Sequence, residues 1–263
     1  MEHGKAPYWR TNLFAVRTAS GNVAEVVVTG FLMSSNRYTS GEYLKSNPSW
    51  HIEDSPWKAE NIRKLLDRSR LPISTVADVG CGAGLIIQEL GKIHPSIEFT
   101  GYDVSPDAKI FWEQYDLPNV SYQQADFFDQ NQRYDLVLCI DVFEHIPDYL
   151  GFLNKLKDQA DYFVFHIPLD MHIQGLLRDL QMTLRESVGH LHYFSERTAM
   201  ATLSDSGLKC IDTTYTSRTL DAPKSFRSRI LNIPRRIGFA ISPKLAIKLF
   251  GGWSLLVLCS TTT

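Results

Sequence analysis

Three glycines alternate with other residues directly after an apolar run, between Val76 and Gly84. The segment reads Val-Ala-Asp-Val-Gly-Cys-Gly-Ala-Gly, and an amphipathic stretch from Leu85 to Ile93 follows at once. A strand that stops at a glycine turn and feeds a helix N-terminus brings backbone N–H groups close to a ligand. The next apolar run ends at Asp103, nineteen residues after Gly84, and an acid at roughly this offset meets ribose hydroxyls. These residues predict a site for a cofactor that contains adenosine.

The spacing of the glycines separates two classes of cofactor. Dinucleotide folds favour G-x-G-x-x-G, whereas here Leu85 occupies the position of the third glycine. With glycines at every second position, the segment resembles the first motif of the class I S-adenosylmethionine-dependent methyltransferases, D-x-G-C-G-x-G. The residues that match this motif are Asp78, Gly80, Cys81, Gly82 and Gly84. A nicotinamide-dependent oxidoreductase is the rival enzyme, and the glycine spacing disfavours it.

Further landmarks of this family follow in order, and the resemblance extends over roughly residues 40 to 215. An acid ends the second strand (Asp103), Ala-Asp-Phe follows the third (125–127), and Tyr-Asp-Leu-Val-Leu-Cys forms the fourth (134–139). These landmarks imply S-adenosylmethionine as the cofactor and say nothing about the methyl acceptor.

Individual roles at the cofactor site follow from this pattern. The Asp103 carboxylate is suited to accept hydrogen bonds from both ribose hydroxyls, and a plain helix cap is the alternative for it. The resemblance implies that Asp126 takes the adenine amino group with Phe127 beside the base, and a simple turn residue is the alternative for Asp126. The expected cofactor-binding residues are Asp78, Gly80, Cys81, Gly82, Gly84, Asp103, Val104, Asp126, Phe127 and the Ile140 carbonyl.

Strands and helices alternate from Val76 onward, which predicts an α/β domain. The strand-like runs are apolar on both faces, as in Leu-Val-Leu-Cys-Ile (136–140), and this is typical of a parallel sheet with helices on both faces. The resemblance implies a Rossmann-like, mainly parallel sheet of seven strands, whose antiparallel last strand lies beside the sixth. The predicted strands are 76–79, 97–102, 120–124, 134–140, 161–167, 208–216 and 253–260, and the predicted helices are 55–67, 85–93, 106–115, 148–157 and 196–206, with an inserted helical segment at 170–190.

The first 54 residues are expected to form an N-terminal extension ahead of a core domain at 55–217. Within it, residues 24–33 read as a strand, and Ser55 with Pro56 reads as an N-cap and first helical residue. Aromatic residues near the start of the core either close over the cofactor as a lid or pack against the sheet edge. These residues are Tyr43, Trp50, His51 and Trp57.

A basic amphipathic insert is expected at 218–250, before a final strand of the core sheet within 251–263. The insert carries eight basic side chains against one acid, Asp221. It fits an anionic or carrier-linked substrate, peripheral contact with an anionic membrane, or an ordinary solvated insert.

Composition sets the broad class. The chain has 263 residues, 44% hydrophobic and 21% charged, with a formal net charge of −2, which is ordinary globular usage and argues against a general nucleic-acid binder. Its four cysteines show no paired close spacing, so buried reduced thiols are expected. No secretory signal pattern and no apolar run of membrane-spanning length is visible, so a cytoplasmic protein is expected.

Two histidines are candidate bases for removing the acceptor proton, because a hydroxyl or amine acceptor must lose a proton. His145 ends the run Asp141-Val-Phe-Glu-His, and His190 lies in Gly-His-Leu-His-Tyr-Phe-Ser (189–195). The first run resembles the E-x-x-E-H of ubiquinone-pathway O-methyltransferases, in which these residues are associated with a divalent metal. Since Asp141 is one methylene shorter than glutamate, no metal is expected here, and a structural Glu144–His145 pair is the alternative to a base.

The predicted function is therefore S-adenosylmethionine-dependent transfer of a methyl group to a small or carrier-linked acceptor, at oxygen. The alternatives are methylation at nitrogen or carbon and a cofactor-binding module without turnover.

Overall fold

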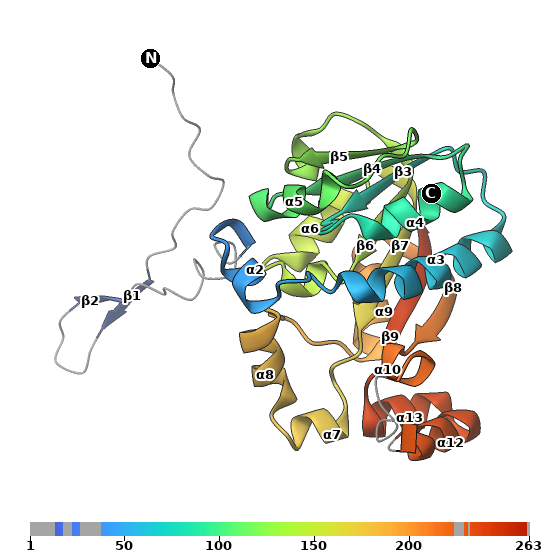
Figure 1. Cartoon of the computed structure of the whole chain (residues 1–263). Helices are drawn as coiled ribbons and strands as arrows, with labels where there is room; N and C mark the ends of the chain where they lie inside the picture. The colour runs from blue at the N-terminus through green and yellow to red at the C-terminus, as the bar shows by residue number, and fades with distance from the viewer. Residues whose placement is uncertain (1–13, 18–22, 27–37, 224–228, 231, 262–263) are drawn as a thin grey trace.

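The computed structural model describes residues 14–17, 23–26, 38–223, 229–230 and 232–261, and its centre is a seven-stranded sheet (Figure 1). The strand order is β5-β4-β3-β6-β7-β9-β8, and all neighbouring strands are parallel except in the two pairs that involve β9. The antiparallel last strand therefore lies beside the sixth, as predicted. The strands are β3 (Thr75–Val79), β4 (Glu98–Asp103), β5 (Val120–Gln124), β6 (Tyr134–Ile140), β7 (Ala160–Pro168), β8 (Leu208–Thr216) and β9 (Ser254–Thr261).

Helices cover both faces of this sheet because its central strands are apolar on both faces. Leu136 and Leu138 of β6 pack with α3 and α4, whereas Val137 and Cys139 of the same strand pack with α6 and α9 on the other face. The α-helices are α2 (Glu42–Ser46), α3 (Ser55–Ser69), α4 (Leu85–Ile93), α5 (Lys109–Trp112), α6 (Tyr149–Leu156), α7 (Ile173–Leu176), α8 (Leu180–Ser187), α9 (Glu196–Asp205), α10 (Arg218–Asp221), α12 (Ile233–Ile241) and α13 (Pro243–Phe250).

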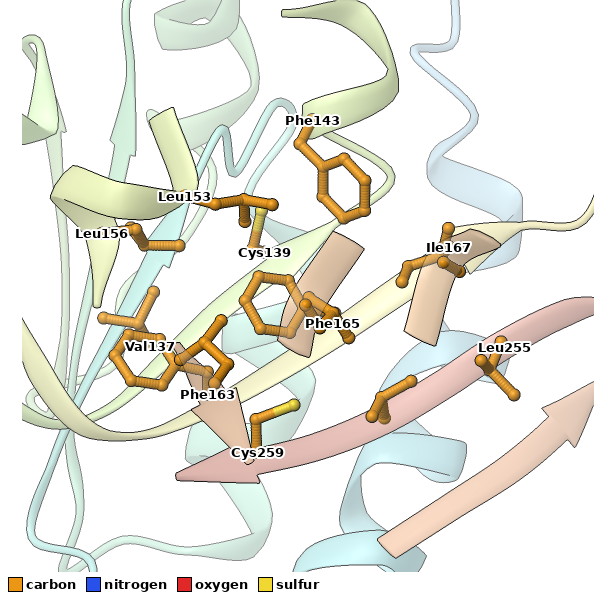
Figure 2. Close-up of a cluster of buried hydrophobic side chains, with 14 of the residues drawn as sticks. Val137, Cys139, Phe143, Leu153, Leu156, Phe163, Phe165, Ile167, Leu255 and Cys259 are labelled. Atoms are coloured by element: carbon orange, nitrogen blue, oxygen red, sulfur yellow. The ribbon is translucent and has the colours of Figure 1, made fainter. Parts of the chain in front are cut away.

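The larger part of the hydrophobic core lies on the α6 side of the sheet (Figure 2). There Phe163 and Phe165 of β7 stack on one another at a centroid distance of 6.1 Å, and Phe143 meets Phe165 edge-to-face at 6.0 Å. Leu153 of α6 is fully buried in this cluster. Aromatic pairs of this kind contribute beyond the area they bury, so they help to hold β7 against the loop after β6.

Two local predictions differ from the structure. A 3₁₀ turn at Ile52–Asp54 runs directly into α3, so Asp54 precedes the helix and Ser55 is its first residue rather than its N-cap. The predicted helix 106–115 is a 3₁₀ turn at Pro106–Ala108 followed by the single turn of α5. The inserted helical segment predicted at 170–190 is confirmed and consists of two helices, α7 and α8.

The ends of the chain match the prediction in part. Val23–Val26 forms β2, which pairs antiparallel with β1 (Phe14–Arg17), and the rest of the predicted strand 24–33 lies outside the described residues. Within the predicted insert the structure describes α10, α12 and α13, while 224–228 and 231 lie outside the described residues. Cys81, Cys139, Cys210 and Cys259 are unbridged and buried or half-buried. Among the described residues, no helix combines the length and apolarity needed to cross a bilayer.

Replacing Leu153 by alanine tests the core on the α6 side. Loss of a fully buried leucine removes its transfer free energy and leaves a cavity, so Leu153→Ala should lower the free energy of unfolding by about 2–5 kcal/mol. Leu150 of the same helix is 42% exposed, and Leu150→Ala is the matched control, expected to change stability by less than about 1 kcal/mol. Denaturant unfolding of both variants measures the difference, and equal losses would contradict this packing.

Candidate active site

A cavity of about 1590 Å³ opens at the edge of the sheet where β3, β4, β6 and β7 end. Ligands bind outside the carboxyl ends of the strands in open α/β sheets, where the strand order reverses, and β3 with its neighbours β4 and β6 forms that point here. One half of the wall comes from the glycine turn and the ends of β3 and β4, and the other half from residues after β6, β7 and β8.

The glycine turn after β3 is held by hydrogen bonds from its backbone. Gly80, Gly82 and Gly84 have φ of 72°, 54° and 76°, in the left-handed region that favours glycine. The amides of Gly80 and Cys81 both donate to the Tyr102 carbonyl, at 2.8 and 3.0 Å, and the Gly82 amide donates to Asp103 Oδ2 at 2.8 Å. Gly80, Cys81 and Gly82 line the cavity. Gly84 serves packing, because a Cβ there would lie 2.4 Å from the Tyr122 ring.

The acids predicted at the ends of β4 and β5 reach the same half of the cavity. Asp103 also accepts from the Ser105 amide at 2.8 Å, while Ser105 caps the following 3₁₀ turn. Val104 is half exposed on the cavity wall, and Asp126 is exposed and accepts from the Phe128 amide at 3.0 Å. The Phe127 ring is buried against Tyr102, at a centroid distance of 5.3 Å. The ends of these strands therefore place Asp103, Val104 and Asp126 in one wall.

Asp78 presents a buried carboxyl group to the cavity. It is 1% exposed, and its Oδ2 has no hydrogen-bond partner among the described residues. Burial and the charge of Asp103 raise the pKa of Asp78 to about 8. A buried, unpaired carboxylate oxygen is stabilised by a cationic ligand, so the site fits the positive charge that S-adenosylmethionine carries. Ile140, 7% exposed at the end of β6, completes this wall.

The two predicted histidines lie in contact with one another in the other half of the cavity wall. The rings of His145 and His190 are 4.9 Å apart and edge-to-face. His190 Nδ1 donates to Asp170 Oδ2 at 2.7 Å, which leaves Nε2 as the ring nitrogen with a lone pair. His145 Nδ1 lies 3.0 Å from both the Gly189 carbonyl and the Tyr38 hydroxyl. His192, by contrast, bonds the Ile146 carbonyl at 3.0 Å and ties this segment to the loop after β6.

Glu144 lies beside these histidines with both carboxyl oxygens buried and without a hydrogen-bond partner among the described residues. Burial, and then the charge of Asp141, raises the pKa of Glu144 well above its ordinary value. One ligand atom each of Glu144, His145 and His190 lies within 4.8 Å of the others, so this cluster has donors that fit a divalent cation.

A second polar chain, which the sequence did not reveal, lines the wall nearest α3. Lys58 contacts Asp141 at 2.7 Å, Asp141 accepts from His166 Nδ1 at 2.6 Å, and His166 Nε2 lies 2.9 Å from the Thr216 hydroxyl. Although burial opposes it, the charges of His166 and Lys58 hold the pKa of Asp141 far below its usual range. One signal was available: His166 interrupts the apolar run of β7 at a position that faces α3. Asp170 was missed too, although it follows the carboxyl end of β7.

Aromatic side chains of the N-terminal extension lie on the glycine turn. The Trp50 ring would contact a Cβ on Gly82 at 3.2 Å, and Tyr43 meets Trp50 edge-to-face at 5.3 Å. Tyr43, Trp50, His51 and Trp57 all line the cavity. Two contacts tie the start of α3 to α10: Arg218 with Asp54 at 2.8 Å, and Trp57 Nε1 donating to Asp221 at 2.9 Å. Closure of this segment as a lid stays a prediction.

The raised pKa of Asp78 predicts a pH dependence of stability. Since the folded-state pKa is about 8 against an ordinary 3.8, the folded chain holds this proton more tightly than the unfolded chain. The contribution of the group is therefore complete below about pH 4 and is lost as the pH rises through about 8. Asp78→Asn, which cannot ionise, should lose less of its Tm than the wild type between pH 5 and 9, measured without cofactor. Asp126→Asn, at an exposed acid of the same cavity, should follow the wild type; parallel curves for all three proteins would refute the raised pKa.

Comparison with known proteins agrees with this geometry. Residues 50–213, more than half of the chain, match the family of methyltransferase domains. A ubiquinone biosynthesis O-methyltransferase from Coxiella burnetii is 41% identical over 80 residues, which cover 28% of this chain and 33% of that protein. N-methyltransferase 4 from Papaver somniferum is 26% identical over 162 residues, which cover 54% and 46%. The chain thus spans less than half the length of these relatives.

Among solved structures, the fold resembles magnesium protoporphyrin IX methyltransferase from Synechocystis PCC 6803 with bound SAH. The TM-score is 0.56 at 15% identity, covering 88% of this chain and 99% of that one. The same enzyme is also known with bound SAM. The family match, the order of the strands and the glycine turn with its acid lead to one conclusion: the chain belongs to the class I S-adenosylmethionine-dependent methyltransferases.

Proposed function

We propose that this protein transfers the methyl group of S-adenosylmethionine to a hydroxyl oxygen of a small or carrier-linked molecule, with His190 as the general base. The observation that carries the proposal is the Asp170–His190 pair, 2.7 Å apart, on the cavity wall opposite the glycine turn. Asp170 fixes the tautomer in which Nε2 accepts a proton, and its charge stabilises the imidazolium that forms.

In the proposed complex the cofactor lies in the half of the cavity that contains Asp78, Gly82 and Asp103. Asp103 binds the ribose, Val104 and Asp126 border the adenine, and Asp78 faces the positively charged methionine end of the cofactor. The backbone of Gly80 to Gly82 allows close approach because these residues hold no large side chain over the cofactor.

The reaction is then a single in-line displacement. When bound, S-adenosylmethionine would supply a methyl group on a positively charged sulfur, which would leave with the electron pair of the broken carbon–sulfur bond. His190 Nε2 would take the proton of the acceptor hydroxyl as its oxygen forms the new bond to the methyl carbon. The cofactor supplies the reactive methyl group, so the protein contributes mainly alignment, for which about 7–11 kcal/mol is available.

Oxygen is favoured over nitrogen as the acceptor atom for a chemical reason. A neutral amine already presents a lone pair, whereas a hydroxyl is a weak nucleophile until a base removes its proton, and a carboxylate-paired histidine supplies that base. The two relatives described above are an O-methyltransferase and an N-methyltransferase by name, so the argument for oxygen rests on the histidine pair.

A second role for the same cluster is favoured by the unpartnered Glu144 carboxyl. Glu144, His145 and His190 would hold a divalent cation, which lowers the pKa of a coordinated hydroxyl. In that case His190 is a ligand rather than a base.

Replacing Asp103 by alanine tests the cofactor half of the site. Loss of a charged hydrogen-bonding partner costs about 1.5–3 kcal/mol, so the Kd for S-adenosylmethionine should rise roughly 10- to 150-fold, measured by calorimetry. Asp116→Ala, at an exposed acid outside the cavity, should bind as the wild type does. Unchanged affinity of Asp103→Ala would mean that this acid does not hold the ribose.

Replacing His190 by alanine tests the acceptor half. If His190 is the base, kcat should fall by roughly 10²–10⁴ with little change in cofactor affinity, and Asp170→Asn should lower kcat in the same direction. His192→Ala is the control within the same segment, since that side chain bonds the backbone of Ile146. Turnover is measured with labelled cofactor against a panel of phenols, alcohols and amines.

Chelation separates the two roles of the cluster. With His190 as base, wild-type turnover should survive treatment with a chelator. Turnover that disappears and returns with added Mg²⁺ or Mn²⁺ would instead support the cation site. Methylation of amines alone within the panel would overturn the assignment to oxygen.

A further inference from the structure

Large apolar side chains are exposed along one side of the C-terminal helices. They belong to a set that we call the hairpin surface: Ile230, Ile233, Ile237, Ile241 and Leu245, which are 50%, 50%, 57%, 80% and 55% exposed. Within α12, residues 233, 237 and 241 are four positions apart and share one face of the helix, whereas Ile230 precedes α12 and Leu245 belongs to α13. Several large apolar side chains exposed on two helices that pack together point to an interaction site.

The opposite side of these helices is already used for packing on the core. Phe239 of α12 stacks on Trp253 at 5.4 Å, and Ala246 and Ile247 of α13 are buried in the core cluster. The hairpin surface therefore points away from the domain because the helices are fixed from the other side. No rearrangement of the fold is needed to expose the hairpin surface.

The neighbouring helix α7 extends the apolar surface. Ile173, Leu176 and Leu177 are 51%, 60% and 82% exposed, and Arg235 Nη2 of α12 lies 3.4 Å from Gln174 Oε1 of α7. Helices α7, α12 and α13 lie at the same end of the molecule, away from β5 and α5 (Figure 1). Apolar side chains from two separate segments of the chain thus gather at one end.

The C-terminal helices themselves are basic, although Glu196 lies beside Lys244 and Lys248. Residues 229–250 contain five basic side chains and no acid. Arg235 is half-buried and bonds Asn232, Gln174 and the Phe250 carbonyl, whereas Arg229, Arg236, Lys244 and Lys248 are exposed. A helix with apolar side chains in contact with solvent and a basic rim binds in the interface of an anionic bilayer, where the apolar groups enter the acyl boundary and the cations meet the head groups.

We propose that the hairpin surface, together with the exposed side chains of α7, docks this protein on the surface of a membrane that contains anionic lipids. The docking is peripheral, since the described helices are too short to span a bilayer. It does not depend on which acceptor the cavity takes. Thr219, Gly252 and Trp253, beside the helical hairpin, line the cavity, so a docked molecule would hold this wall of the cavity close to the lipid.

Flotation of the full-length chain with vesicles tests the proposal. The wild type should bind vesicles of phosphatidylcholine and phosphatidylglycerol and bind pure phosphatidylcholine far more weakly, with affinity falling as salt rises. Ile237→Glu/Ile241→Glu should weaken binding to the mixed vesicles by at least about 10-fold, because two exposed apolar side chains that would enter the bilayer are lost. Ile110→Glu, at an isoleucine of α5 that is 61% exposed, is the matched control and should bind as the wild type does.

A second pair of variants tests the charge without touching the apolar residues. Lys244→Glu/Lys248→Glu should weaken binding roughly 30-fold or more at low salt and much less at high salt, since each basic residue near the lipid surface contributes about a factor of five. Lys109→Glu/Lys209→Glu changes the net charge equally at exposed lysines elsewhere and should have a small effect. The Tm and cofactor affinity of all variants establish that they fold.

Several results would overturn the proposal. Wild-type binding that is equal on neutral and anionic vesicles, or variants that bind as the wild type does, would show that this end of the molecule does not meet lipid. A concentration-dependent dimer that Ile237→Glu/Ile241→Glu abolishes, without vesicle binding by the wild type, would assign the surface to a second copy of the chain. These readouts do not involve turnover, so they stand apart from the test of the His190 base.

Discussion

The hydrogen bond from the Gly82 amide to the Asp103 carboxylate joins the two elements on which the cofactor half of the cavity depends. It connects the turn after β3 to the end of β4, and the amides of Gly80 and Cys81 add two bonds to the Tyr102 carbonyl. These bonds require glycine turns in the left-handed region and parallel strands that end side by side. If either strand shifted by one residue, the acid and the turn would separate, so the register of the sheet sets the geometry of the site.

The other half of the cavity depends on carboxylates that orient basic side chains. Asp170 holds His190, and Asp141 holds both Lys58 and His166. Asp141 follows β6 with φ of 54°, an uncommon conformation for a residue other than glycine. Its ion pair with Lys58 and its hydrogen bond from His166 compensate for burial. Asp78 and Glu144 lack such partners among the described residues, and their pKa values are raised instead. The cavity wall therefore contains two kinds of acid. Asp141 and Asp170 are paired with basic side chains, whereas Asp78 and Glu144 have raised pKa values and carboxyl oxygens without a partner among the described residues.

The helices differ in what they bury. The apolar residues of α3 and α6 pack on the sheet. Helices α12 and α13 have apolar residues on two sides, of which one side packs on the core and the other is exposed. The N-terminal aromatic residues and α10 approach the cavity from opposite ends of the chain, joined through Asp54 and Arg218. The N-terminal aromatic residues and α10 thus line the cavity from outside the sheet, whereas the ends of the sheet strands form the half of the wall that contains the glycine turn.

The sequence by itself determined the cofactor half of the protein. Its signals are local. They are the glycine spacing from Gly80 to Gly84, the acid Asp103 nineteen residues after Gly84, and the apolar runs, which predict the bounds of the strands within one or two residues. Local errors arose where short-range geometry was ambiguous, as at Ser55, where a 3₁₀ turn runs into the helix. The family resemblance, rather than periodicity, supplied the antiparallel last strand.

Only the tertiary structure shows which side chains contact one another in the acceptor half of the cavity. Asp170 and His190 are twenty residues apart, and Lys58, Asp141, His166 and Thr216 come from four separate segments. The partner of each titratable group depends on which strand ends lie side by side. The distance between side chains from different strand ends cannot be read from neighbouring residues in the sequence. Exposure is likewise a property of the packed molecule: the periodicity of residues 230–241 indicates an apolar helix face, but only the fold shows that solvent, rather than the core, meets it.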